Sequence, residues 1–274
     1  MNPTRRTFVG AGGALLAASH LKADPAYPTN GPKIGVASYS LRKFKRGDAI
    51  AMIQRLGVRY VSIKSFHLPY ESSPDEIRAG REEFAKAGLT VLSGGNTPFD
   101  KADRDDIRRK FEYAKLAGIP MLVSAPTQET LPMLEPFVKE YDIRVAVHNH
   151  GPEDKHFPTP QSVLAVVKNM DPRMGLCIDV GHTMRAGADP VESAREAGPR
   201  LFDMHIKDLK QQSSDDQCAV GDGIVPVTAI FKQLHRMGYT GGVMLEYEAD
   251  EDAPFAPMMK SIGYERGVLA GLHG

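Results

Sequence analysis

Short apolar runs alternate with longer amphipathic stretches along most of the sequence. The short runs are continuously apolar, a pattern typical of strands that are buried on both faces of a parallel sheet. Eight strands are predicted on this basis, at residues 33–38, 58–63, 89–93, 119–124, 143–147, 175–178, 201–206 and 242–245. Each is short enough to be one strand of a compact domain.

A stretch with helical spacing follows each predicted strand. Helices are expected at residues 48–56, 74–87, 103–117, 128–141, 160–170, 190–197, 227–237 and 256–272. Local signals support several of these boundaries. Ser73 and Pro74 combine a capping residue with a proline at the first helical position, and Gly88 and Gly118 follow two of the helices.

Eight βα units within one domain length predict a closed (β/α)₈ barrel, the TIM barrel, as a single domain over residues 33–274. An open, doubly wound sheet is the alternative. No glycine-rich phosphate-binding loop follows the first predicted strand, which is evidence against a dinucleotide site.

The charge balance narrows the class of partner. The sequence has 34 lysines and arginines and 34 aspartates and glutamates, so its formal net charge is zero. A balanced charge gives no electrostatic signature for nucleic acid or for an anionic membrane. We therefore expect a small-molecule partner and no nucleic acid. The chain has no tryptophan, so tyrosine and phenylalanine must supply any aromatic wall of a binding pocket.

The N-terminal residues predict export. Arg5 and Arg6, followed by Phe8, have the spacing of a twin-arginine signal, and the Gly/Ala-rich run at 9–18 is too short to serve as a permanent membrane anchor. We assign residues 1–23 to the export signal and the proline-rich residues 24–32 to a linker. The expected location is the periplasm, without a membrane anchor; a frayed basic tail is the alternative.

Potential metal ligands stand at the ends of the last four predicted strands: His148, Asp179, His205 and Glu246. Because the carboxyl ends of barrel strands surround one pocket, these side chains are expected to converge. Two imidazoles and two carboxylates suit one divalent ion (Mn²⁺, Co²⁺, Zn²⁺ or Mg²⁺), with the nitrogens disfavouring Mg²⁺. Taken singly, each residue has a simpler explanation, as a helix cap or a hydrogen-bonded core residue.

Four motifs in order carry a resemblance to a known family. They are CIDVGH at 177–182, FDMHIKD at 202–208, VGDG at 220–223 and GYTGGVMLE at 238–246. With these motifs the chain resembles the xylose isomerase-like barrels, including the sugar phosphate isomerase/epimerase group. The resemblance implies metal ligands on strands five to eight. His148, however, stands where the epimerases usually have glutamate.

The strand-five difference bears on mechanism. The resemblance implies two metal-bound glutamates, of which one removes a proton and the other returns it. With His148 in place of the first glutamate, this symmetrical two-glutamate mechanism is lost. Glu246 remains available as a base, and His150 is the nearest spare titrating group. Lys207 is a candidate proton donor or ligand for a substrate oxygen; a buried ion pair with Asp208 or a neighbour is the alternative.

Three further residues are candidates for contact with a sugar. His182 resembles the substrate-contacting histidine of the family, with helix capping as the alternative. Tyr39 and His67 follow the first and second predicted strands and are expected to line the pocket.

Together these features predict a divalent-metal-dependent isomerase or epimerase that acts through an enediolate on an unphosphorylated keto- or aldo-sugar, because phosphorylated sugars are scarce outside the cytoplasm. The same enediolate can expel a β-substituent. A lyase acting on a 3-keto-glycoside or an inosose-like substrate is therefore the main alternative. A non-catalytic sugar-binding barrel and a metal-dependent endonuclease are weaker ones. The resemblance also leaves a homo-oligomer open.

Overall fold

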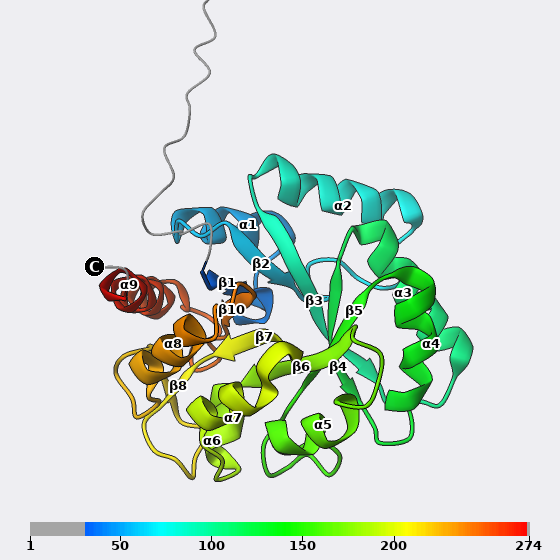
Figure 1. Ribbon diagram of the computed structural model, residues 1–274. Helices are drawn as coiled ribbons and strands as arrows, with labels where there is room; N and C mark the ends of the chain where they lie inside the picture. The colour runs from blue at the N-terminus through cyan, green and yellow to red at the C-terminus, as the bar shows by residue number, and fades with distance from the viewer. Residues whose placement is uncertain (1–30, 273–274) are drawn as a thin grey trace, which may run out of the picture.

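The computed structural model describes residues 31–272 and contains a closed barrel of parallel strands (Figure 1). The strands follow one another around the barrel in the order β1-β10-β7-β6-β5-β4-β3-β2. Their bounds are β1 Lys33–Ala37, β2 Tyr60–Ile63, β3 Thr90–Phe99, β4 Met121–Pro126, β5 Arg144–His148, β6 Met174–Asp179, β7 Leu201–Ile206 and β10 Gly242–Leu245. The predicted (β/α)₈ barrel is thus confirmed.

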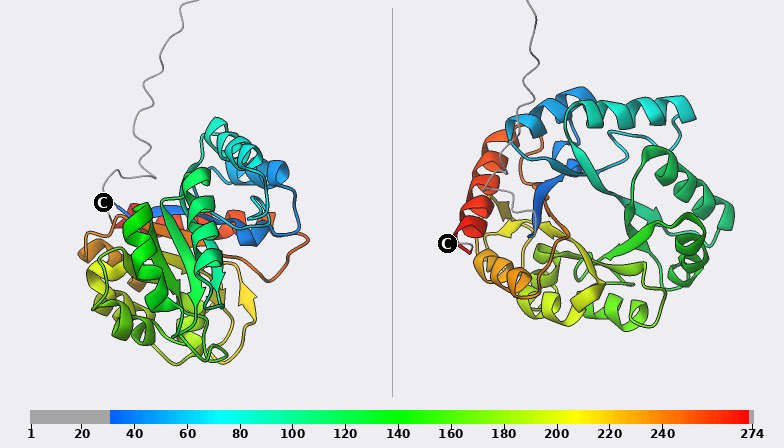
Figure 2. Two further views of the ribbon diagram at one scale, coloured as in Figure 1. Left: turned by 90° about the vertical axis from the view of Figure 1, so that its right-hand side faces the viewer. Right: turned by 45° about the horizontal axis from the view of Figure 1, so that its top comes forward.

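Helices form a ring outside the strands, which the tilted view in Figure 2 shows most clearly. The α-helices are α1 Arg46–Arg55, α2 Pro74–Lys86, α3 Arg104–Ala117, α4 Leu131–Tyr141, α5 Pro160–Val167, α6 Val180–Arg185, α7 Pro190–Ala197, α8 Val227–Arg236 and α9 Phe255–Gly271. Two short 3₁₀ helices, η1 Ser38–Leu41 and η2 Gly198–Arg200, complete the set for residues 31–272. Helix α2 begins at the predicted capping residue, where Ser73 and Glu76 form a capping box.

Three features differ from the predicted elements. Strand β3 continues to Phe99, beyond the predicted end at residue 93. The prediction stopped there because Gly94 and Gly95 carry no side chains to extend the apolar pattern. The pairing of β3 with β4 also shifts at this point. Helix α6 starts directly after β6. Between β7 and α8, β8 (Asp208–Leu209) and β9 (Gln217–Cys218) form a small antiparallel hairpin.

The N-terminal predictions fall mostly outside this structure. The expected export signal at residues 1–23, and the linker as far as residue 30, lie outside the described residues. Among residues 31–272, no helix is long and apolar enough to cross a membrane.

The strands are buried on both faces, as their apolar runs predict. Every residue of β6 and of β7 is buried. A small apolar cluster links four strands: Met121, Val123, Ala146, Cys177 and Phe202. The larger core contains buried side chains from both the strands and the surrounding helices.

The register of the strands places their ends at one level. His148 of β5 pairs with Cys177, and Asp179 of β6 pairs with His205 of β7. The backbone N–H of Glu246 donates to the Ile206 carbonyl at 2.8 Å, which extends the ladder past β10. The four predicted ligands therefore share one end of the barrel.

Helix α9 carries a buried acid on its core-facing side. Glu265 lies in line with buried Met258, Ile262 and Leu269. Both of its carboxyl oxygens are buried without a hydrogen-bond partner in the described part of the chain. Burial raises the pKa of Glu265 well above its ordinary value of 4.5, because a buried carboxylate loses its hydration.

This buried acid predicts a stability that falls as the pH rises. Above pH 4.5 the unfolded chain releases the Glu265 proton while the folded chain keeps it, so folding is progressively disfavoured up to the folded-state pKa. Glu265→Gln removes this dependence. Denaturation curves should show that the free energy of unfolding of the variant rises relative to that of the wild type by about 1.4 kcal/mol per pH unit in that window.

The exposed Glu129 provides the matched control, because its side chain lies on the surface. Glu129→Gln should follow the wild-type stability at every pH. Parallel curves for Glu265→Gln and the wild type would contradict the prediction.

Candidate metal centre and pocket

The four predicted ligands converge on one point. One ligand atom from each of His148, Asp179, His205 and Glu246 lies within 4.8 Å of all the others. His148 Nε2 is 3.1 Å from His205 Nδ1 and 3.5 Å from Asp179 Oδ2. His205 Nδ1 is 3.2 Å from Glu246 Oε2. These four side chains could therefore hold a single cation.

Asp179 has two roles, one for each carboxyl oxygen. Its Oδ1 accepts a hydrogen bond from the His182 backbone N–H at 2.8 Å and caps helix α6. Its Oδ2 faces the cluster. Asn149 holds the strand end in place, because its Oδ1 accepts from the Asp179 N–H at 3.0 Å and its Nδ2 donates to Thr183 at 3.1 Å. The capping and metal-binding explanations of Asp179 are thus compatible.

Lys207 lies buried beside the cluster. Its Nζ is 3.1 Å from Asp179 Oδ2 and 3.0 Å from Glu246 Oε2, and it also donates to Glu248. Although burial opposes ionisation, the Lys207 ammonium holds the pKa of Asp179 and Glu246 below their ordinary values. Both carboxylates are therefore ionised at neutral pH.

Asp208, the alternative partner of Lys207, turns the other way. Its carboxylate accepts backbone hydrogen bonds from Gly221 at 2.9 Å and from Gly223 at 3.0 Å. The VGDG motif is thereby fastened to the end of β7. The Asp208 side chain organises a loop, and Lys207 pairs with carboxylates of the cluster.

The donor set fits a divalent ion. With both imidazoles neutral, as metal binding requires, the carboxylates of Asp179, Glu246 and Glu248 and the Lys207 ammonium leave two negative charges, which such an ion would neutralise. Asp179 Oδ2 is buried and makes no well-aligned hydrogen bond among residues 31–272, although the Lys207 ammonium lies 3.1 Å away. Burial lowers the pKa of His148 to about 3, so its ring is neutral and can offer a lone pair. A buried carboxylate oxygen facing the neutral His148 ring is an environment that a metal ion satisfies.

Cys177 offers a second, less suitable ligand set. It could form a three-residue group with His148 and His205. Burial raises the pKa of the Cys177 thiol to about 12, however, so the thiolate that a metal requires is disfavoured. The mixed set of two histidines and two carboxylates is the better candidate.

A pocket of about 190 Å³ opens over the cluster. Its lining side chains are Tyr39, Lys64, Asn96, His148, His150, His182, Glu246 and Glu248. They come from both sides of the barrel rim, so a bound molecule would touch the cluster on one side and the ends of the first strands on the other.

Residues 50–264 match the family described as xylose isomerase-like TIM barrel. The chain belongs to this family. The resemblance predicted from the four motifs is therefore confirmed.

Three similar proteins illustrate the family. An inosose dehydratase from Lacticaseibacillus casei is 23% identical over 145 residues, covering 46% of this chain and 48% of that protein. The chain thus spans about half the length of such curated relatives. A solved structure from Parabacteroides distasonis has 26% identity and a TM-score of 0.68, covering 85% of this chain and 97% of the other. D-psicose 3-epimerase from Clostridium cellulolyticum H10 has 15% identity and a TM-score of 0.70, covering 86% and 99%, and shares the fold.

Three of the predicted pocket residues of this xylose isomerase-like barrel do line the pocket: Tyr39, His150 and His182. His182 Nδ1 accepts a hydrogen bond from Arg185 at 3.2 Å, so a neutral ring carries its proton on Nε2. His150 is held between Asn96 Nδ2, 2.5 Å from its Nε2, and Asp154, 3.4 Å from its Nδ1. In this arrangement the Nε2 lone pair of His150 is already occupied, which weakens its candidacy as the second base.

His67 is a correction, because the structure places it outside the pocket lining. Its Nδ1 is 3.0 Å from Ser38 Oγ, and its Nε2 lies 3.2 Å from the carbonyl oxygens of Leu41 and Phe44. The ring is buried and ties the loop after β2 to the loop after β1. Lys207 likewise lies beside the cluster and not in the pocket lining.

Sequence reasoning overlooked Lys64 and Asn96 in the pocket. Lys64 directly follows the apolar run of β2, just as Glu246 follows β10, so position alone could have identified it. Asn96 lies in the part of β3 that the apolar pattern did not reveal.

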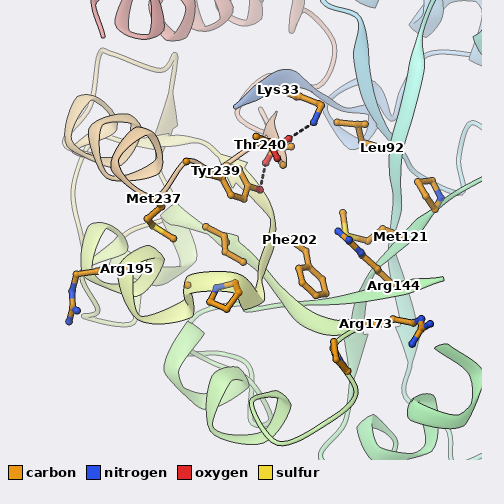
Figure 3. Close-up of a pocket in the computed structure, with 18 of the residues that line it drawn as sticks. Lys33, Leu92, Met121, Arg144, Arg173, Arg195, Phe202, Met237, Tyr239 and Thr240 are labelled. Atoms are coloured by element: carbon orange, nitrogen blue, oxygen red, sulfur yellow. Dashed lines mark hydrogen bonds between the residues drawn. The ribbon is translucent and has the colours of Figure 1, made fainter. Parts of the chain in front are cut away.

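A larger hollow of about 1070 Å³ lies at the opposite end of the barrel (Figure 3). Its lining includes the first residues of several strands, such as Lys33, Met121 and Arg144. Arg144 stacks over Phe202, with 5.1 Å between the guanidinium and the ring centre. The metal-ligating cluster and the converging ionisable groups belong to the smaller pocket, at the end where barrel enzymes carry their chemistry.

The cluster predicts tight binding of one divalent ion. Titration calorimetry with Co²⁺ should give one site per chain. Asp179→Asn keeps a helix-capping oxygen but loses a charge, and it should weaken Co²⁺ binding by at least about 10–100-fold. His148→Ala should have a similar effect.

The exposed His156 serves as the control for nonspecific histidine binding. His156→Ala should bind Co²⁺ as the wild type does. Equal affinity in all four proteins would exclude the proposed ligand set.

Proposed function

We propose that this protein is a divalent-metal-dependent sugar isomerase or epimerase. It would remove a proton next to the carbonyl of an unphosphorylated keto- or aldo-sugar. The observation that carries the proposal is the mixed cluster of His148, Asp179, His205 and Glu246, with the Glu246 side chain lining a pocket above it. Membership in the xylose isomerase-like family supports the same chemical class.

Three side chains in or beside the pocket have a task in this chemistry. A bound divalent ion would supply Lewis-acid polarisation of the substrate carbonyl. Glu246 is ionised and faces the pocket, so its carboxylate can accept the carbon-bound proton. The His182 Nε2–H can donate to a substrate oxygen. Lys207 keeps Glu246 and Asp179 charged and fixed in position.

The pocket favours an unphosphorylated substrate. None of the eight side chains that line it is an arginine, the residue that binds phosphate through paired hydrogen bonds, and Lys64 is the one lysine among them. A pocket of about 190 Å³ also suits a small sugar better than a long chain. Tyr39 packs near Phe66, with ring centres 5.9 Å apart, and offers an aromatic surface at the rim.

Dehydration is the second candidate. His148 stands on strand five, so Glu246 is the only carboxylate of the cluster that lines the pocket, and a symmetrical two-glutamate exchange has no counterpart there. The similarity to an inosose dehydratase points the same way. In that reaction the proton would be removed in the same manner, and a neighbouring hydroxyl would leave.

Proton exchange in D₂O tests the proposal. Protein loaded with Mn²⁺ would be incubated with free ketoses, aldoses and 3-keto-glycosides and followed by NMR. We expect deuterium at the carbon beside the carbonyl, together with a new isomer. Glu246→Gln should lower the exchange rate at least about 100-fold, because it removes the base.

Glu129→Gln, on the exposed surface, is the matched control and should exchange at the wild-type rate. An unsaturated product would assign the dehydration instead. Metal binding without exchange on any of these sugars would contradict both reactions and favour a sugar-binding barrel.

Export by the twin-arginine route is also proposed, from residues 1–23. A reporter that is active only outside the cytoplasm, fused after residue 32, should be exported in a bacterial host. Replacing both Arg5 and Arg6 by lysine should abolish export, whereas Lys22→Arg should not. A reporter that stays cytoplasmic with the unaltered segment would overturn the proposal.

A further inference from the structure

Lys64 is a cation without an acidic partner in a site that otherwise pairs its charges. It follows β2, is half-buried and lines the pocket. Its Nζ donates to the Asn96 carbonyl at 2.7 Å. Within residues 31–272, no carboxylate lies within ion-pair distance of it. An ammonium has three N–H donors, so two remain for a ligand.

The neighbouring cations are different. Lys207 is surrounded by carboxylates, Arg42 pairs with Glu251 at 2.9 Å, and Arg185 contacts Glu153. These side chains serve the protein's own structure. Lys64 is the described cation that the pocket leaves available for a substrate.

The position of Lys64 complements that of Glu246. The cluster occupies the ends of β5, β6, β7 and β10, whereas Lys64, Asn96 and Tyr39 belong to the β1–β3 side of the rim. The Lys64 Nζ lies 5.7 Å from the centre of the Tyr39 ring, a contact that favours the charged form and steadies the side chain. A sugar in the pocket would therefore meet Glu246 and Lys64 from different parts of the rim.

Burial also suits Lys64 to proton transfer. Its pKa is lowered from the ordinary value of 10.5, because burial disfavours the ammonium, and the Glu246 charge only partly opposes this. A lysine with a lowered pKa releases a proton more readily at neutral pH. His150, the other candidate, already has both ring nitrogens engaged.

We propose that Lys64 is the catalytic acid that completes the reaction, in place of a second glutamate. Glu246 takes the proton from the carbon beside the carbonyl, and the C–H electron pair moves into the enolate. A Lys64 N–H bond then breaks and a new C–H bond forms. Protonation on the other side of the same carbon gives the epimer. Protonation at the neighbouring carbon gives the isomer, and the hydroxyl proton of the enediolate then passes from one oxygen to the other, so that the carbonyl moves. Glu246 ends protonated and Lys64 neutral, and exchange with water restores both.

This inference rests on the proposed function, and the experiment separates the two. Lys64→Met replaces the aliphatic part of the side chain and has no proton to give, whereas Lys64→Arg keeps the charge but holds its proton too tightly. Both variants and the wild type would be loaded with Mn²⁺ and incubated in D₂O with the active sugar. NMR would follow deuterium in the starting sugar and the amount of new isomer separately.

We expect both variants to keep deuterium exchange within about threefold of the wild type, since Glu246 is intact, while isomer formation falls at least about 100-fold. Lys210→Met, which removes an exposed lysine paired with Asp216, should leave both signals unchanged. Thermal unfolding would confirm that the variants are folded.

The other outcomes overturn the inference in distinguishable ways. Isomer formation restored by arginine would mean that Lys64 acts through its charge alone. Loss of exchange together with isomer formation would place Lys64 in binding or in the first step. If the wild-type protein formed an elimination product in place of an isomer, no carbon would be protonated and Lys64 would have no such step to catalyse. A wild type without exchange would refute the proposed function itself, and this step with it.

Discussion

The buried ammonium of Lys207 is the interaction on which the functional end of the barrel depends. It contacts Asp179, Glu246 and Glu248, and carboxylates brought so close together would otherwise repel one another strongly in a dry environment. One ammonium cannot neutralise all three. The remaining charge, the buried Oδ2 of Asp179 and the neutral ring of His148 together suit this end of the barrel to a divalent cation. Thus the same contacts that make this end stable also leave it ready for a metal.

Barrel closure makes this arrangement possible, because it fixes the level at which each strand ends. The pairing of Asp179 with His205, and of His148 with Cys177, sets the ligands side by side before any side-chain rotation. The helix cap on Asp179 then removes the freedom of its carboxylate. The backbone hydrogen bonds that the fold requires in any case thus also offset the conformational entropy lost when the ligand side chains are held in place.

The sequence predicted the barrel, because short, continuous apolar runs identify strands buried on both faces. It also predicted the convergence of the four ligand side chains, because the polar residue that ends each run lies at the rim. The same rule failed for His67, since a side chain after a strand can also turn back and bind loop carbonyls. Asn96 was hidden for the opposite reason, because Gly94 and Gly95 interrupt the apolar pattern of β3. Helix α6 was missed because its cap, Asp179, had been considered mainly as a ligand. Side-chain direction decides these cases, and apolar periodicity does not encode it.

The histidine on strand five is best understood through charge. With Lys207 counted and both histidine rings neutral, as metal binding requires, the cluster and Glu248 carry two negative charges, which one divalent ion would balance. A glutamate at the position of His148 would add a third, and the metal-bound site would become anionic. A neutral metal-bound site repels a developing enolate less than an anionic one. It also leaves Lys64, which no carboxylate of the described residues neutralises, free to face that negative charge from the β1–β3 side. The loss of a carboxylate on one side of the pocket and the presence of an available cation on the other are therefore two parts of one electrostatic arrangement.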